Sequence, residues 1–94
     1  MQDLTVEQFA RHVNESFTVN GEARTPLVLV EAAERGGARP GGRQRFVLLF
    51  HGPPAPVLPQ ATYRFEHPAF PSLEIFIVPV GPEGDRMRYE AVFA

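Results

Sequence analysis

The chain has 94 residues, of which 44% are hydrophobic and 21% are charged, and its formal net charge is −2. This length supports one modest core, so we predict a single β domain over residues 1–94. The small net charge argues against nucleic acid or an anionic membrane as a partner. The absence of cysteine excludes disulfides and thiolate metal sites.

The N-terminal segment MQDLTVEQFARH lacks the basic and apolar regions of a secretory signal. Elsewhere, no apolar stretch approaches the roughly 20 residues that a membrane-spanning helix needs. We therefore expect a cytoplasmic protein.

One short helix is expected near the N-terminus, over about residues 5–13. Thr5 and Gln8 have the spacing of a capping box, in which each side chain bonds the other residue's backbone N–H. Leu4 and Phe9 flank this box at the positions of a hydrophobic staple. A helix this short is unstable alone, so it should dock on the rest of the fold.

Short segments with alternating or continuous apolar residues predict strands, and ten prolines and eight glycines supply the turns between them. Six such segments are expected, over residues 16–19, 25–34, 46–50, 61–67, 73–80 and 87–93. No helical pattern separates them, which predicts an antiparallel meander. Several are apolar on both faces, so we expect an all-β, six-stranded antiparallel barrel or sandwich.

The inward-facing residues of these strands should form the core. On this basis we expect the following side chains to be largely buried: Phe46, Leu48, Phe50, Tyr63, Phe65, Ile75, Ile77, Tyr89 and Phe93.

Residues 35–44 are rich in glycine and arginine and predict a mobile loop. The arginines in and beside it could contact phosphate groups, but no aromatic platform accompanies them. We favour a solvated loop and expect no nucleic-acid partner. The arginines concerned are Arg35, Arg39, Arg43 and Arg45.

Histidines offer the main alternative to a non-catalytic domain. His51, His67 and Glu66, with His12 as a third imidazole, could form a metal or acid–base site. The spacing of a metal-binding motif is absent, and strand alternation directs Glu66 and His67 to opposite faces. We therefore favour strand-closing histidines bonded to turn carbonyls, and we expect no metal or other cofactor.

Covalent catalysis has little support in the sequence. The serines and threonines lie outside any nucleophile-elbow or phosphate-loop pattern. The only aspartates are Asp3, near the terminus, and Asp85, in a predicted turn, and neither suits a buried triad. We therefore do not expect an enzyme.

The segment Pro53–Pro59 holds four prolines and is stiff, so docking it on a partner would cost little ordering entropy. Val57 and Leu58, together with a nearby Phe70, could serve there as an apolar anchor. Alternatively, Val57 and Leu58 could fold back over an open end of the barrel. The residues leave both possibilities open.

The central stretch also carries a family pattern. Its residues are Phe46, Leu48-Leu49-Phe50, Gly52-Pro53, Pro56, Leu58-Pro59-Gln60, Thr62-Tyr63 and Glu66-His67-Pro68. With the segments LTVEQF, VPVGP and RYEAVF, this pattern resembles DUF6916, a family of small bacterial proteins of unknown function. The resemblance implies a structural, fibre-associated or assembly role beside phage-tail-like collar or fibre proteins, and it supplies no catalytic residues.

These observations lead to one functional expectation. The chain should be a non-enzymatic module that binds another protein through a free sheet edge or through the proline-rich segment, at Val57, Leu58 and Phe70. The alternative is a small-molecule-binding or metal-dependent enzyme domain that uses His51, His67 and Glu66.

Overall fold

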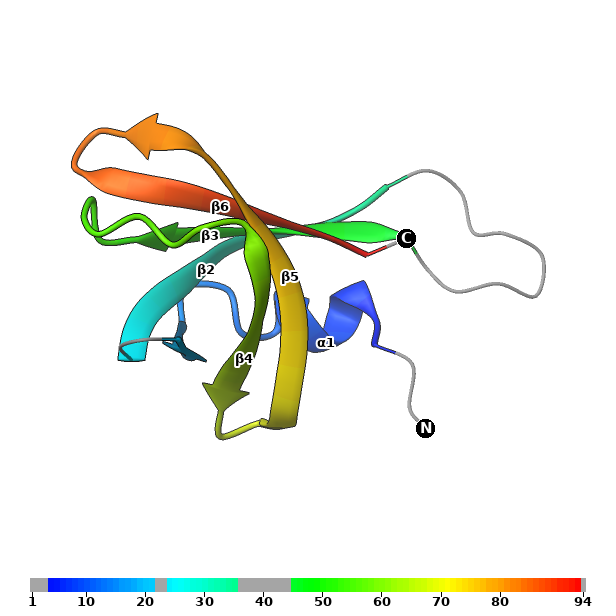
Figure 1. The fold of residues 1–94 in the computed structure, drawn as a ribbon. Coiled ribbons are helices and arrows are strands. Elements are labelled where there is room, and N and C mark those ends of the chain that lie inside the picture. The colour runs from blue at the N-terminus through cyan, green and yellow to red at the C-terminus, as the bar shows by residue number, and fades with distance from the viewer. Residues whose placement is uncertain (1–3, 22–23, 36–44, 94) are drawn as a thin grey trace.

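The computed structural model describes residues 4–21, 24–35 and 45–93, which form one short helix and a closed antiparallel barrel of six strands (Figure 1). The elements are α1 (Val6–Ala10), β1 (Ser16–Asn20), β2 (Arg24–Glu34), β3 (Phe46–Gly52), β4 (Ala61–His67), β5 (Phe70–Glu83) and β6 (Arg86–Phe93). The predicted small antiparallel barrel is confirmed.

The order of strands around the barrel is β1-β2-β3-β6-β5-β4. Each half of the chain is a three-stranded meander, but the β3–β4 connection crosses one end of the barrel and joins two strands that are not neighbours. This order corrects the expectation of one continuous meander. Residues 53–60 between these strands contain four prolines, which lack N–H donors and so do not build a tight hairpin.

Closure of the barrel also corrects the expectation of a free sheet edge. Every strand that the structure describes has a hydrogen-bonded neighbour on each side. The barrel therefore has no strand with one side wholly unpaired, although the first half of β5 pairs only with β4.

Two long strands, β2 and β5, change partners along their length and so bend the sheet into a barrel. In β5, residues up to Ile77 pair with β4, and residues from Val78 pair with β6. A bulge between Pro79 and Gly81 adds to the bend, and Gly81 has a φ of 114°, which favours glycine. As a result, the first half of β5 is not paired with the end of β6.

Helix α1 packs beside this gap. The predicted capping box is present: the Gln8 N–H donates to Thr5 Oγ1 at 3.4 Å, and the Thr5 N–H donates to Gln8 Oε1 at 3.0 Å. The helix ends at Ala10, earlier than expected, because the chain turns toward β1 through Asn14, whose φ is 76°. Asparagine tolerates this left-handed conformation better than most residues.

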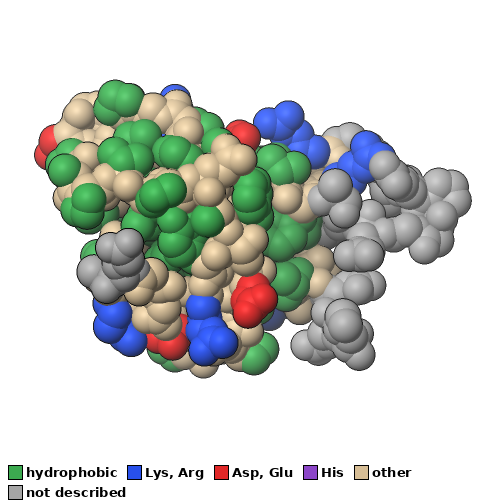
Figure 2. Space-filling model, viewed as in Figure 1, with side chains coloured by type: hydrophobic (Ala, Val, Ile, Leu, Met, Phe, Trp, Pro, Cys, Tyr) green, Lys and Arg blue, Asp and Glu red, His purple; other side chains and the backbone are tan. Residues whose placement is uncertain are grey.

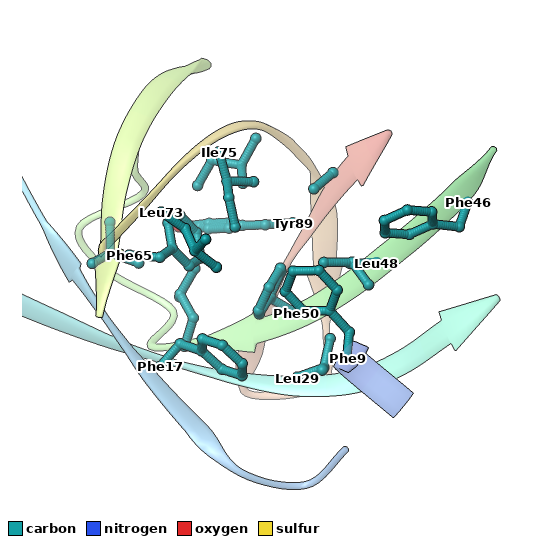
Figure 3. Packing of buried hydrophobic residues seen from close by; sticks show 14 of the residues in the cluster. Phe9, Phe17, Leu29, Phe46, Leu48, Phe50, Phe65, Leu73, Ile75 and Tyr89 are labelled. Carbon is teal, nitrogen blue, oxygen red and sulfur yellow. The ribbon is translucent and has the colours of Figure 1, made fainter. Parts of the chain in front are cut away.

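Phe9 projects from α1 into the core and is fully buried (Figure 3). Its ring stacks on Phe70 of β5 at a centroid distance of 5.0 Å. It also lies 5.9 Å from the rings of Phe46 in β3 and Phe93 in β6. Phe9 therefore closes the gap between β5 and β6 by joining the core.

The remaining core agrees closely with the sequence. The predicted core side chains are buried except Tyr63 and Phe93, which are half-buried and pack against the cluster. The core also includes residues that the prediction omitted, among them Phe17, Leu27 and Leu29.

The barrel is closed differently at its two ends. At the helix end lie α1, the turn at residues 11–15 and the β4–β5 hairpin. At the proline end lie the β3–β4 connection and the β5–β6 hairpin.

Most of the expected mobile loop, together with Arg39 and Arg43, lies outside the described residues. At its base, the Arg35 N–H donates to the Arg45 carbonyl at 2.8 Å. In the part of the chain that the structure describes, no helix has the length and apolar character required to cross a membrane.

Candidate functional site

Two histidines and one glutamate meet at the helix end, and the turn after α1 positions two of them. The Glu15 N–H donates to the His12 carbonyl at 3.1 Å, which brings these two residues close. The turn is also bonded to β2: the Asn14 N–H donates to the Leu29 carbonyl at 2.6 Å, and the Leu29 N–H donates to the Glu15 carbonyl at 3.0 Å. Backbone bonds thus fix the turn that carries both side chains.

The third residue, His67, is the last residue of β4, where a two-residue turn leads into β5. Only 8% of its side chain is exposed. Its ring lies 4.6 Å from the ring of Phe17, 5.7 Å from that of Phe70 and 4.7 Å from that of His12. The imidazole is therefore held among aromatic rings.

One carboxylate oxygen of Glu15 contacts both imidazoles. Glu15 Oε1 lies 2.7 Å from His67 Nε2 and 2.9 Å from His12 Nδ1. The Ala69 N–H donates to His67 Nδ1 at 3.0 Å, so the proton of a neutral His67 is on Nε2 and is donated to Glu15. The hydrogen bonds from His67 and then His12 lower the pKa of the Glu15 carboxyl below its ordinary value.

Two surface hollows flank this cluster. One, of about 550 Å³, separates α1 from the start of β5, and the other, of about 360 Å³, lies on the opposite side of Phe70. His12 contributes to the first hollow and His67 to the second. Small molecules can therefore approach the cluster from solvent.

The alternative site expected from the sequence does not assemble. Glu66 pairs with Arg24 at 3.2 Å, and His51 lies 3.5 Å from Glu83. Among the described residues, the one group of at least three possible metal ligands is His12, Glu15 and His67. The expectation that a turn carbonyl bonds His67 is also wrong, because in this turn the Ala69 N–H donates to His67 Nδ1.

Sequence reasoning missed Glu15. The local indication of a contact is that His12 and Glu15 are three residues apart, at the end of the predicted helix. Their contact with His67, which is 52 residues further along the chain from Glu15, depends on the pairing of β1 with β4. No local pattern carries that information.

At the proline end, Val57 and Leu58 have different environments. Leu58 is half-buried against the core, and its N–H donates to the hydroxyl of Tyr89 at 2.9 Å. The Tyr63 hydroxyl donates to the Pro59 carbonyl at 2.7 Å. Val57 is 46% exposed. Leu58 thus helps to cover the barrel end, which is one of the two roles considered above for Val57 and Leu58. Val57, in contrast, faces solvent.

Phe70 does not join Val57 and Leu58. They precede the first residue of β4, whereas Phe70 follows its last residue, so seven residues of strand, about 20 Å, separate them. Phe70 is half-buried against Phe9 at the helix end. The three expected binding residues therefore do not form one surface.

Two further large apolar side chains are exposed on β5. Phe76 and Val80, on the outer face of β5, are 48% and 39% exposed. Ala61 pairs with Ile77, so the connection that precedes Ala61 ends beside the point where the second half of β5 begins. Figure 2 shows hydrophobic side chains gathered over this end of the molecule. We call Val57, Phe76 and Val80 the apolar surface.

These observations define a small β-barrel whose two ends are closed by a helix and by a proline-rich connection. A comparison with protein-family models matches residues 4–93 to a domain of unknown function, DUF6916. The chain belongs to this family. No curated protein and no solved structure matches it.

Proposed function

We propose that this protein is a non-enzymatic protein-binding or assembly module whose partner, another protein, docks on the apolar surface at the proline end. The proposal rests on the exposure of Val57, Phe76 and Val80 beside an anchored connection. Large apolar side chains that are exposed together are typical of interaction sites.

The connection is suited to binding because it is already ordered. Two tyrosine hydroxyls bond its backbone, at Leu58 and at Pro59, and four prolines restrict its φ angles. The surface is therefore preformed, and little conformational entropy of the connection would be lost when a partner binds.

Charged residues border this surface and provide the polar rim that protein interfaces commonly have. The Glu83 carboxylate lies 3.4 Å from Arg88 Nε and 3.5 Å from His51 Nε2. Asp85, whose side chain is 95% exposed, contacts Arg86 at 3.8 Å. An aspartate this exposed supports a role at the rim better than one in a catalytic triad.

The family resemblance indicates the kind of partner. It implies an assembly role beside tail-fibre or collar-type proteins of phage-tail-like particles. We therefore propose a protein of this type as the occupant of the apolar surface.

The test is affinity capture from a lysate of the organism that encodes the chain, followed by mass spectrometry. The bait is the wild type or the variant Val57→Ser/Phe76→Ser/Val80→Ser. The wild type should retain a fibre- or collar-type protein, and the triple variant should lose it while its circular dichroism spectrum is unchanged.

Two matched controls locate the surface. Val92→Ser changes a side chain that is 62% exposed on β6, outside the apolar surface, and Phe70→Ser changes the helix end. Both variants should still capture the partner if they fold. Capture that survives the triple variant would place the interface elsewhere, and turnover of a small molecule without any captured protein would contradict a binding module.

A further inference from the structure

The geometry points to a binding site for a divalent transition-metal ion, with zinc as the best match, formed by His12 Nδ1, a Glu15 carboxylate oxygen and His67 Nε2. The three ligand atoms lie within 4.8 Å of one another. This site is independent of the apolar surface, which lies at the opposite end of β4.

The distances from Glu15 to the two imidazoles are close to those between the ligands of a zinc ion. Zinc binds nitrogen and oxygen ligands at about 2.0–2.2 Å, so tetrahedral ligand atoms are about 3.3 Å apart. Here the two imidazole nitrogens lie 2.7 Å and 2.9 Å from Glu15 Oε1. The two imidazoles would move slightly away from Glu15 Oε1 as the cation replaces the protons between them, and all three ligand atoms already lie within 4.8 Å of one another.

The residue types favour a transition metal over calcium or magnesium. Imidazole suits zinc, copper, iron and nickel, whereas calcium and magnesium prefer oxygen ligands. Glu15 is held as a carboxylate by its two imidazole partners. Two neutral imidazoles and one carboxylate would thus leave a net charge of +1 on a bound zinc ion.

The scaffold holds the ligands in place while leaving access. The rings of Phe17 and Phe70 hold His67, and backbone bonds to β2 fix the turn that carries His12 and Glu15. The side chains of His12 and Glu15 are 22% and 48% exposed, so a cation can enter from solvent. Three protein ligands leave a fourth position for water, as in open zinc sites.

Metal binding has one specific structural consequence. In the present structure, His67 Nδ1 accepts a hydrogen bond from the Ala69 N–H. When Nε2 binds a metal, a neutral imidazole carries its proton on Nδ1, which can no longer accept. Zinc should therefore change the tautomer of His67 and remove the hydrogen-bond acceptor of Ala69.

The test uses untagged protein treated with a chelator and then titrated with zinc by calorimetry, with metal analysis after dialysis. We expect one zinc ion per chain. His12→Ala and Glu15→Gln should each weaken binding at least about tenfold, because each removes a ligand or its charge. His51→Ala and Glu66→Gln, which remove the residues of the alternative site, should bind zinc as the wild type does.

Nuclear magnetic resonance supplies a second measurement that does not depend on variants of the buried His67. On addition of zinc, the Ala69 amide signal should shift and the nitrogen signals of His67 should report Nδ1–H. Absence of stoichiometric zinc, or zinc that is lost in His51→Ala and retained in Glu15→Gln, would overturn the site. An unchanged Ala69 signal in zinc-loaded protein would do so as well, and would leave a hydrogen-bonded cluster that only joins the turn to β4.

Discussion

The two ends of the barrel are closed by different physical means. At the helix end, Phe9 is fully buried and contacts aromatic rings from several strands. At the proline end, Leu58 is only half-buried, and tyrosine hydroxyls bond the connection that carries it. Closure by core packing buries the apolar side chain of Phe9, whereas closure by a hydrogen-bonded connection leaves that of Val57 exposed. The second end is thus the one where we propose that a partner docks.

The largest expected effect is at the helix end. Phe9→Ala should destabilise the protein by about 3–5 kcal/mol, because it leaves a cavity among aromatic rings. The melting temperature should then fall by more than about 10 °C. Phe50→Ala, in the centre of β3, should have a similar effect.

The matched control is Phe76→Ala, which truncates the same residue type where it is 48% exposed, and its effect should stay within about 0.5 kcal/mol. If Phe9→Ala resembled this control, α1 would be an appendage and not part of the core.

A smaller effect is expected where β3 enters the proline-rich connection. A Cβ at Gly52 would collide with Leu27 Cδ2, and Leu27 is fully buried. Gly52→Ala should therefore cost about 1–3 kcal/mol through overpacking. Urea denaturation measures this cost, and a variant as stable as the wild type would contradict tight packing between β3 and Leu27.

Much of this architecture follows from local sequence. The alternation of apolar residues predicts β4 at Ala61–His67, and the capping box predicts the helix start at Thr5. The pairing of β3 with β6 could not be predicted, because β-pairing between distant segments depends on the whole barrel. The contact between Glu15 and His67 has the same origin. The environment of Val57 depends on how the connection crosses the barrel end, which its prolines alone do not specify.

The hydrogen bond that anchors the connection should contribute about 1 kcal/mol. Tyr89→Phe removes the hydroxyl that accepts from the Leu58 N–H and keeps the buried ring. Its free energy of unfolding should fall by about that amount in urea. Tyr63→Phe removes a more exposed bond and should cost less, about 0.5 kcal/mol. Equal stability of Tyr89→Phe and the wild type would argue against an anchored connection.

The smallest expected effect on stability is that of Val57→Ser, which changes an exposed side chain and should stay within about 0.5 kcal/mol of the wild type. Partner capture by this variant should nevertheless decrease. A stability loss as large as that expected for Gly52→Ala would mean that Val57 covers the core and is not part of a binding surface.

The most direct test of the account is amide hydrogen exchange of the protein alone and in complex with the captured partner. Binding should slow exchange at Val57, Leu58 and in the second half of β5 around Val78 and Val80, and it should leave Ala69 and the turn after α1 unchanged. Protection confined to the helix end would contradict the assignment of the proline end as the binding surface.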